Sequence, residues 1–363
     1  MMKLSLSIFL YATVLLLSGV SCTREAPVPG GRISMTLSTA DPETKAGSGD
    51  PADGGGIAVD ANGDPDLVIA IADQTGALVA WYPDDFWGAM ATGYSSDCLT
   101  LHQSSTPSSE STVFISGPGR GNYTVLALAN TSGLPDGVLS SLAAESTLAG
   151  LESVYLSVAS GEPSFGASMP LSAKGSLSVN SNGNGHIDLA LLRPVARVSL
   201  TFRNMTGNPG LEIHSASAVI HEMNPSRGYL FPQTSDYISG FDRDITLTGD
   251  DPLVFSDNKS TLPLKQVFPS IAPVRAVGSR YLCDIYFRVT KSGKTYDSSD
   301  PSTFDAYDFT DLPVHDSRSA DIHSLKRNQF LKIETRISRN AHNISFNFEV
   351  QGWDEKTEQV FFH

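Results

Sequence analysis

Residues 22–46 read CTREAPVPGGRISMTLSTADPETKA. Near the middle of this stretch, Ile33, Met35 and Leu37 alternate with serine and threonine. Alternation with a period of two is typical of a β-strand that buries one face and leaves the other in water. The stretch therefore predicts a half-buried strand near the beginning of a β-protein.

The segment after this strand offers little to bury, because residues 40–66 are rich in Gly, Ala, Asp and Pro. Lys45 lies in this segment and Arg32 directly precedes the strand. A trypsin-like protease could cut after either residue, because basic residues in mobile loops are easily nicked. Two interpretations follow. Either cleavage releases the strand and everything before it, or the strand is an ordinary first strand with a long loop. The residues alone favour neither.

The residues before Cys22 have the features of a secretory signal peptide. Lys3 supplies a positive charge, residues 4–17 form an uncharged apolar run, and small residues lead to the cysteine. The run is too short for a membrane-spanning helix. A cysteine placed there is the acceptor that bacterial lipoprotein processing acylates. We therefore expect residues 1–21 to be removed and Cys22 to carry lipid. Gly19 stands where leucine is usual, and ordinary cleavage nearby is the alternative.

The composition bounds the architecture and argues against one class of partner. A chain of 363 residues is long enough for two domains that each bury a core. The formal net charge is −14 and the sequence holds no basic stripe, so nucleic acid is not expected to bind. Charged residues make up 18% of the chain while Gly and Ser abound, as in secreted all-β surface proteins.

Alternating and apolar runs predict strands along the rest of the chain. Residues 123–130 are apolar on both faces, as in a central strand. Residues 138–151 have helical spacing and predict one short helix. A new alternating strand begins just after Arg193, where we place the domain boundary. Residues 331–337 and 344–350 predict an antiparallel pair near the end. Further strands are expected at 216–220, 244–247 and 281–289.

The cysteines and histidines do not gather into a site. If Cys22 carries lipid, Cys98 and Cys283 remain in different halves of the chain, and two buried free thiols are favoured over a disulfide. His214 and His221 are seven residues apart, an odd spacing that places them on opposite faces of a strand.

One acidic stretch resembles a calcium loop. Residues 60–66 have suitable acid spacing, but Pro65 stands where an EF-hand needs glycine, and Ile71 stands where the bidentate glutamate belongs. A solvated turn is the favoured interpretation, and we expect no metal or cofactor.

No nucleotide, zinc or nucleophile-elbow pattern occurs in the sequence. Asp311, His315 and Ser317 are the residue types of a catalytic triad, but they share one polar loop with no oxyanion signal. We therefore expect that the protein is not an enzyme, and hydrolysis is the weakest hypothesis.

Aromatic residues gather once, around a Pro-Asp-Asp turn. They are Trp81, Tyr82, Phe86 and Trp87. Such a cluster can stack on a sugar, but buried packing is the favoured interpretation.

Several short motifs occur in one order along the chain. They are Cys22, ISMTL at 33–37, TKAG at 44–47, YTVLALANT at 123–131, RPVARV at 193–198, RN at 327–328 and VQGW at 350–353. The ordered set resembles the fimbrillins of the Bacteroidales type V pilus, the subunits that polymerise into surface fimbriae.

The resemblance implies an all-β fold of two transthyretin-like, Greek-key β-sandwich domains in tandem, with one short helix in the first. The parts are then a signal peptide at 1–21, a lipid-bearing propeptide at 22–45, and domains at 46–192 and 193–363.

The resemblance also implies a route of maturation. Members of that family are exported as outer-membrane lipoproteins and are then cut in the loop after the first strand. The cut removes lipid and strand together and leaves a hydrophobic groove. Carried over, the cut falls between Lys45 and Ala46, and the removable strand carries Ile33, Met35 and Leu37.

In that family the groove is filled by a C-terminal segment of a neighbouring subunit. Carried over, the donor lies in residues 354–363, with Val360, Phe361 and Phe362 as its apolar part. The implied partners are other fimbrial subunits, a maturation protease, the outer membrane while lipid is attached, and a receptor on a host or bacterial surface.

Two departures from the family pattern matter. The usual cut follows arginine, and Lys45 stands there in this chain. The donor segment offers two good anchors on one face, Val360 and Phe362, which leaves stalk, tip and anchor roles open. The competing hypothesis is a lipoprotein that stays on the outer membrane as a pilus anchor or a glycan-binding module.

Overall fold

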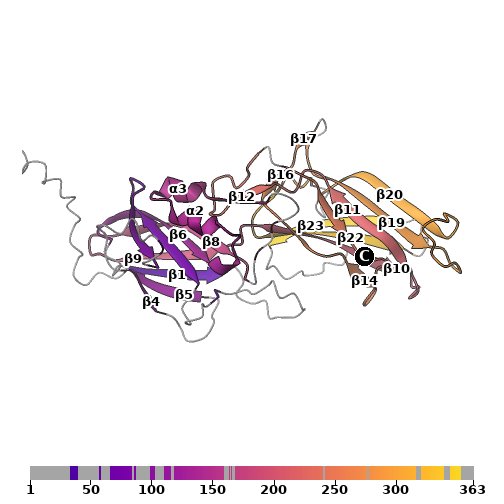
Figure 1. Cartoon of the computed structure of the whole chain (residues 1–363), viewed down its shortest axis with the longest axis horizontal. Helices are drawn as coiled ribbons and strands as arrows, with labels where there is room; N and C mark the ends of the chain where they lie inside the picture. Colours follow the sequence, from indigo (N-terminus) through magenta and orange to yellow (C-terminus); the bar gives the residue numbers. More distant parts are fainter. Residues whose placement is uncertain are drawn as a thin grey trace, which may run out of the picture.

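The computed structural model describes residues 33–39, 57–58, 66–83, 86, 99–102, 110–115, 118–158, 163, 165, 168–239, 242–275, 278–315, 320–338 and 344–352. Strands dominate these residues, and two short α-helices occur among them. Figure 1 shows two bodies side by side along the long axis of the molecule, with β1 in one and β10 in the other. The expected all-β sandwich architecture is confirmed.

Two four-stranded sheets make the first half of the chain. Their orders are β4-β5-β1-β9 and β3-β2-β6-β8, and their facing sides share one buried core. The strands are β1 (Ile33–Thr39), β2 (Leu67–Ala72), β3 (Leu78–Tyr82), β4 (Leu99–His102), β5 (Glu110–Ile115), β6 (Gly121–Ala129), β8 (Leu171–Val179) and β9 (Gly185–Leu191).

Strand β6 lies between β2 and β8, as its apolar sequence predicts. Val125 and Ala127 belong to the core between the sheets. Leu126 and Leu128 belong to a second core on the outer side of the same sheet. Both sets of side chains are apolar because neither face of the strand meets water over residues 125–129.

Two helices cover that outer side. α2 (Val138–Ala143) and α3 (Leu148–Ser153) replace the single helix predicted over 138–151. The break has a local cause, because Thr147 is extended and its hydroxyl accepts a hydrogen bond from the backbone N–H of Gly150 at 3.2 Å. Threonine in this position caps and so begins a new helix.

A five-stranded and a four-stranded sheet make the second half. Their orders are β14-β10-β22-β23, with β15 also paired to β10, and β13-β11-β19-β20. One buried core fills the space between them. The strands are β10 (Ala196–Met205), β11 (Ile213–Ile220), β13 (Ile245–Thr248), β14 (Lys259–Thr261), β15 (Lys265–Val267), β19 (Leu282–Thr290), β20 (Phe304–Pro313), β22 (Gln329–Ser338) and β23 (Ile344–Gly352).

The strands predicted in this half are confirmed, including the antiparallel pair of β22 and β23. Short pairs complete it: β16 (Ser270–Ile271) with β21 (Ser324–Leu325), and β17 (Val274–Arg275) with β18 (Gly278–Ser279).

The two halves repeat one arrangement. β1 and β10 each open a half, each lies inside its sheet, and each pairs in parallel with a later strand, β9 or β22. The second sheets correspond as well, β3-β2-β6-β8 to β13-β11-β19-β20. Among the described strands of the first half, none corresponds to β23.

A segment of the second half crosses back onto the first. β12 (Arg227–Tyr229) pairs antiparallel with β7 (Tyr155–Ser157). Leu230 and Phe231, which follow β12, are buried in the helix-covered core of the first half. The two bodies therefore share a core.

Arg327 fastens this crossing segment. Its guanidinium is buried and donates to both carboxylate oxygens of Asp236 at 2.7 and 2.9 Å, to the carbonyls of Tyr229 and Phe231 at 3.2 Å, and to the hydroxyl of Ser172 at 3.2 Å. A buried charge is tolerated when it is paired and its N–H groups are hydrogen-bonded. The RN motif at 327–328 thus has a structural role at the junction.

The prediction for His214 and His221 is wrong. Ser215 has a positive φ of 52°, and the pairing of β11 with β19 shifts by a residue between His214 and Ser217. This β-bulge adds one residue and reverses the parity. Both histidines therefore share the outward face, where His214 lies beside Arg288 and stacks on Tyr296 with ring centroids 3.7 Å apart.

Cys283 is a buried free thiol on β19, as expected. Burial raises its pKa to about 12, so the thiol stays protonated and unreactive at neutral pH. Cys98 lies outside the described residues.

Candidate functional site

The position held by β1 is the candidate functional site. β1 pairs antiparallel with β5 on one side and parallel with β9 on the other. It is therefore an interior strand, with partners along both edges, although it comes first in the chain. Its removal would leave two unpaired strand edges facing each other across a gap.

The three apolar side chains of β1 point into the core between the sheets. Ile33 is 3% exposed, and Met35 and Leu37 are completely buried. Burying such a side chain contributes on the order of 1.5 to 3 kcal/mol. The predicted alternation is confirmed, and β1 supplies a substantial share of the core of the first half.

The outward side chains of β1 are short and polar. The hydroxyl of Ser34 lies 2.8 Å from Nδ1 of His186 on β9, and Nε2 of the same ring lies 2.9 Å from the carboxylate of Asp188. The arrangement fits a ring that accepts from Ser34 and donates to Asp188. The solvent side of β1 thus contacts β9 through the hydroxyl of Ser34.

After β1, the next described residues are Ile57 and Ala58. Ile57 is buried in the same core as β1, and the backbone N–H of Ala58 donates to the side-chain oxygen of Asn130 at 2.7 Å. The covalent path from β1 to every later strand runs through the residues between Thr39 and Ile57. A single cut on that path would leave β1 held by non-covalent contacts alone.

Several predicted site residues lie outside the described residues. They are Cys22, Lys45, Ala46, Val360, Phe361 and Phe362, and also Trp87 and Ser317. The lipid site, the cut and the donor segment therefore stay predictions.

Sequence reasoning missed two features of the site. The strand over Glu110–Ile115 was not predicted, although its residues STVFI are rich in strand formers. The contact of Ser34 with His186 was also missed, because it depends on a pairing between strands about 150 residues apart that no local pattern reveals.

The aromatic cluster is packed into the protein. Trp81 is buried in the helix-covered core, and Phe86 packs against the same core while half-buried. Tyr82 packs against the core between the sheets. Buried packing is confirmed for these three rings, and it leaves the face of Trp81 unavailable to a sugar.

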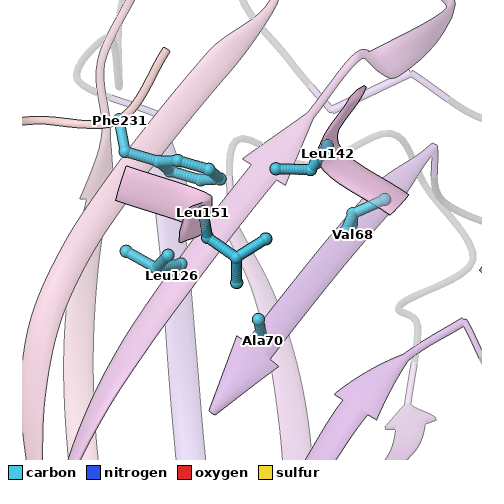
Figure 2. Close-up of a pocket in the computed structure, with 6 residues that line it drawn as sticks. All are labelled: Val68, Ala70, Leu126, Leu142, Leu151 and Phe231. Carbon is cyan, nitrogen blue, oxygen red and sulfur yellow. The ribbon is translucent and has the colours of Figure 1, made fainter. Parts of the chain in front are cut away.

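The helix-covered core contains a small void rather than a ligand pocket. Figure 2 shows that Leu142, Leu151 and Phe231 close it from above, over Val68 and Leu126 of the sheet. The space between these side chains does not admit a water molecule. The void is therefore a packing defect at the place where the second half contacts the first.

The other candidate groups have structural roles. Asp66 of the calcium-like stretch accepts hydrogen bonds from the hydroxyl of Thr131 and, at 2.9 Å, from the backbone N–H of Ser132. His315 packs its ring against Phe348, with centroids 5.7 Å apart. Within the part of the chain that the structure describes, no cluster of His, Cys, Asp and Glu has the makings of a metal site. None of the described helices has the length and apolarity to span a membrane.

No protein-family model and no curated protein matches this sequence. Solved structures do match it over nearly its whole length. A Parabacteroides distasonis protein with a proposed role in cell adhesion is 14% identical, with a TM-score of 0.51, and the match covers 93% of this chain and 100% of that one. A fimbrilin from Porphyromonas gingivalis is 12% identical, with a TM-score of 0.50, and the match covers 89% and 97%.

The chain has the fimbrillin fold. The resemblance drawn from the ordered motifs is confirmed at the level of the fold. In this fimbrillin fold, β1 is buried between two partner strands and is linked to every later strand by one stretch of chain.

Proposed function

We propose that the protein is a structural and adhesive subunit of a cell-surface fimbrium. It is exported as a lipoprotein precursor acylated at Cys22, cut between Lys45 and Ala46, and polymerised by strand exchange. The observation that supports this proposal is the place of β1, an interior strand whose covalent link to the fold runs through one stretch of chain.

The packing of β1 is compatible with cleavage followed by strand exchange. While the chain is uncut, β1 fills its own groove and keeps the precursor soluble. After the cut, loss of Ile33, Met35 and Leu37 opens apolar pockets and two strand edges. A strand from a neighbouring subunit restores both the main-chain hydrogen bonds and the side-chain contacts, as in β-augmentation. Head-to-tail contacts of this kind do not close on themselves, so they build filaments.

The proposal also assigns the propeptide, the two domains, the donor segment and the partners. Residues 22–45 are the propeptide, and residues 46–192 and 193–363 are the two domains. The donor segment lies in residues 354–363 with Val360, Phe361 and Phe362. The partners are other fimbrial subunits, a maturation protease, the outer membrane at the precursor stage and a surface receptor.

A second candidate is a lipoprotein that keeps β1 and stays on the outer membrane as a pilus anchor. The observation that favours it is the full integration of β1, which pairs with both neighbours and buries three apolar side chains. Nothing in that packing requires β1 to leave.

The N-terminus and the intact mass of the protein recovered from the cell surface separate these candidates. A lipid-free chain that begins at Ala46 supports maturation and polymerisation. An acylated chain that still begins at Cys22 contradicts them and leaves the anchor. The variant Lys45→Gln should keep the surface protein uncut, and Arg32→Gln serves as its control.

A further inference from the structure

We propose that the vacated β1 position takes a strand of a different subunit, and not residues 354–363 of a second copy of this chain. The inference rests on the proposed function, since the position opens only when β1 leaves. The strand that fits has apolar side chains at three alternating positions and neutral or basic side chains between them.

The inward side of the position selects three apolar anchors. Met35 lies in register between Val113 of β5 and Ile187 of β9. Leu37 lies one step further along, beside Leu189, and is also completely buried. Ile33 completes the row at the other end. A side chain that carries charge at any of these levels would enter the core without a partner, which is strongly unfavourable.

Residues 354–363 do not supply that row. They read DEKTEQVFFH, so Val360 and Phe362 share one face and Glu358 is the next residue on it. With Val360 and Phe362 in neighbouring pockets, the third level of the row either receives the carboxylate of Glu358 or is left empty, depending on the register. The opposite face offers Phe361 between Gln359 and His363 and is poorer still.

The apolar run that precedes this segment is already engaged. β23 pairs with β22 from Ile344 to Gly352. Phe348 is buried in the core of the second half, and Phe346 packs edge-to-face on Phe309 with centroids 4.9 Å apart. A second copy therefore cannot lend this run without opening its own core.

Charge at the rim of the position disfavours the same segment. Asp188 is exposed on β9 in register with Thr36. β1 itself places only serine and threonine at these outward levels. Residues 354–363 carry three acids and one lysine, so they bring like charge to an acidic rim.

The test is a strand-exchange experiment on the full chain. A site-specific protease sequence replaces residues 43–47, and the folded protein is cut there so that β1 stays bound. Fluorescent peptides of residues 31–40, of residues 352–363, and of residues 352–363 with Glu358→Ile are then added. Peptide bound to the protein and release of the N-terminal fragment are followed by size exclusion and mass spectrometry.

We expect the 31–40 peptide to exchange, and the 352–363 peptide to bind about tenfold more weakly or worse. Glu358→Ile should recover most of that loss, because it completes the apolar row. Asp188→Lys in the protein should strengthen binding of the 352–363 peptide about twofold, by removing a repulsion at an exposed site.

The outcomes separate the inference from the proposed function. Binding of the 352–363 peptide within about threefold of the 31–40 peptide overturns the inference and leaves strand exchange intact. If no peptide exchanges and the N-terminal fragment stays bound, the position does not open, and the proposed function and the inference both fail.

Discussion

At the scale of single residues, Arg327 illustrates how this fold handles a buried charge. Its side chain is 5% exposed and meets acceptors from β8, from the segment after β12 and from Asp236. Each of these contacts is a charge-assisted hydrogen bond to a buried guanidinium. Together they fix the relative positions of the segments that Arg327 contacts. The residue joins parts of the chain that are far apart in sequence.

Arg327→Met should lower the free energy of unfolding by about 2 to 4 kcal/mol, because it removes the charged partner of Asp236 and one donor to each of the carbonyls of Tyr229 and Phe231. Denaturant unfolding followed by fluorescence measures the loss. Arg336→Met is the matched control, since Arg336 is half exposed and bonds Glu334 at the surface. A change below about 1 kcal/mol is expected there. Equal losses in the two variants would contradict the role of Arg327.

His221 gives the fold a dependence on pH. Burial lowers its pKa, but hydrogen bonds to Asp284 at 3.1 Å and Asp244 at 3.3 Å outweigh burial and raise the pKa above the ordinary 6.5. A group with a raised folded pKa adds stability below its unfolded pKa and loses it as pH rises through the folded value. The contribution is therefore complete below about pH 6.5 and fades above it.

His221→Gln should remove that contribution. The melting temperature of the natural protein should exceed that of the variant by more at pH 6 than at pH 8.5, and Asp284→Asn should show the same pattern. Melting curves of the three proteins across this range make the measurement. A difference between natural protein and variant that stays constant with pH would refute the assignment.

At the scale of elements, the sequence predicted what is decided locally. Alternation located β1, β10, β22 and β23, and the doubly apolar run located β6 as a central strand. Pairing was not predictable in the same way, because the parallel contact of β1 with β9 joins residues about 150 positions apart. The bulge at Ser215 and the cap at Thr147 were missed because one residue in a special conformation overrides the periodicity around it.

The two faces of β1 should respond in opposite ways to charge. Met35→Lys places an ammonium in the core between the sheets, where it has no partner, and should cost several kcal/mol or prevent folding of the precursor. Thr36→Lys, on the outward face beside Asp188, should fold normally. Soluble yield and melting temperature of the uncut chain measure both. Similar behaviour of the two variants would contradict the interior place of β1.

At the scale of the whole molecule, the repeat of one sandwich in two halves explains the place of the candidate site. β10 occupies in the second half the place that β1 occupies in the first. β10 is preceded and followed by folded chain, so no single cut frees it. Among the described residues, folded chain follows β1 and none precedes it. A single cut after β1 would therefore separate it from the later strands. Position in the chain, rather than a special motif, therefore distinguishes β1 from β10.

The junction should make the two halves unfold together. Phe231 enters the helix-covered core of the first half from the second half, beside Leu126 and Leu151 (Figure 2). Independent halves would each unfold at their own temperature. A shared core instead links their stabilities.

Phe231→Ala should therefore do more than enlarge the void. It should cost about 3 to 5 kcal/mol and split one thermal transition into two, because the halves lose their shared apolar contact. Differential scanning calorimetry distinguishes one transition from two. Ile271→Ala is the control, since Ile271 is 45% exposed in the second half and should leave a single transition. Two transitions already in the natural protein would show that the junction does not couple the halves, and their stabilities would then be independent.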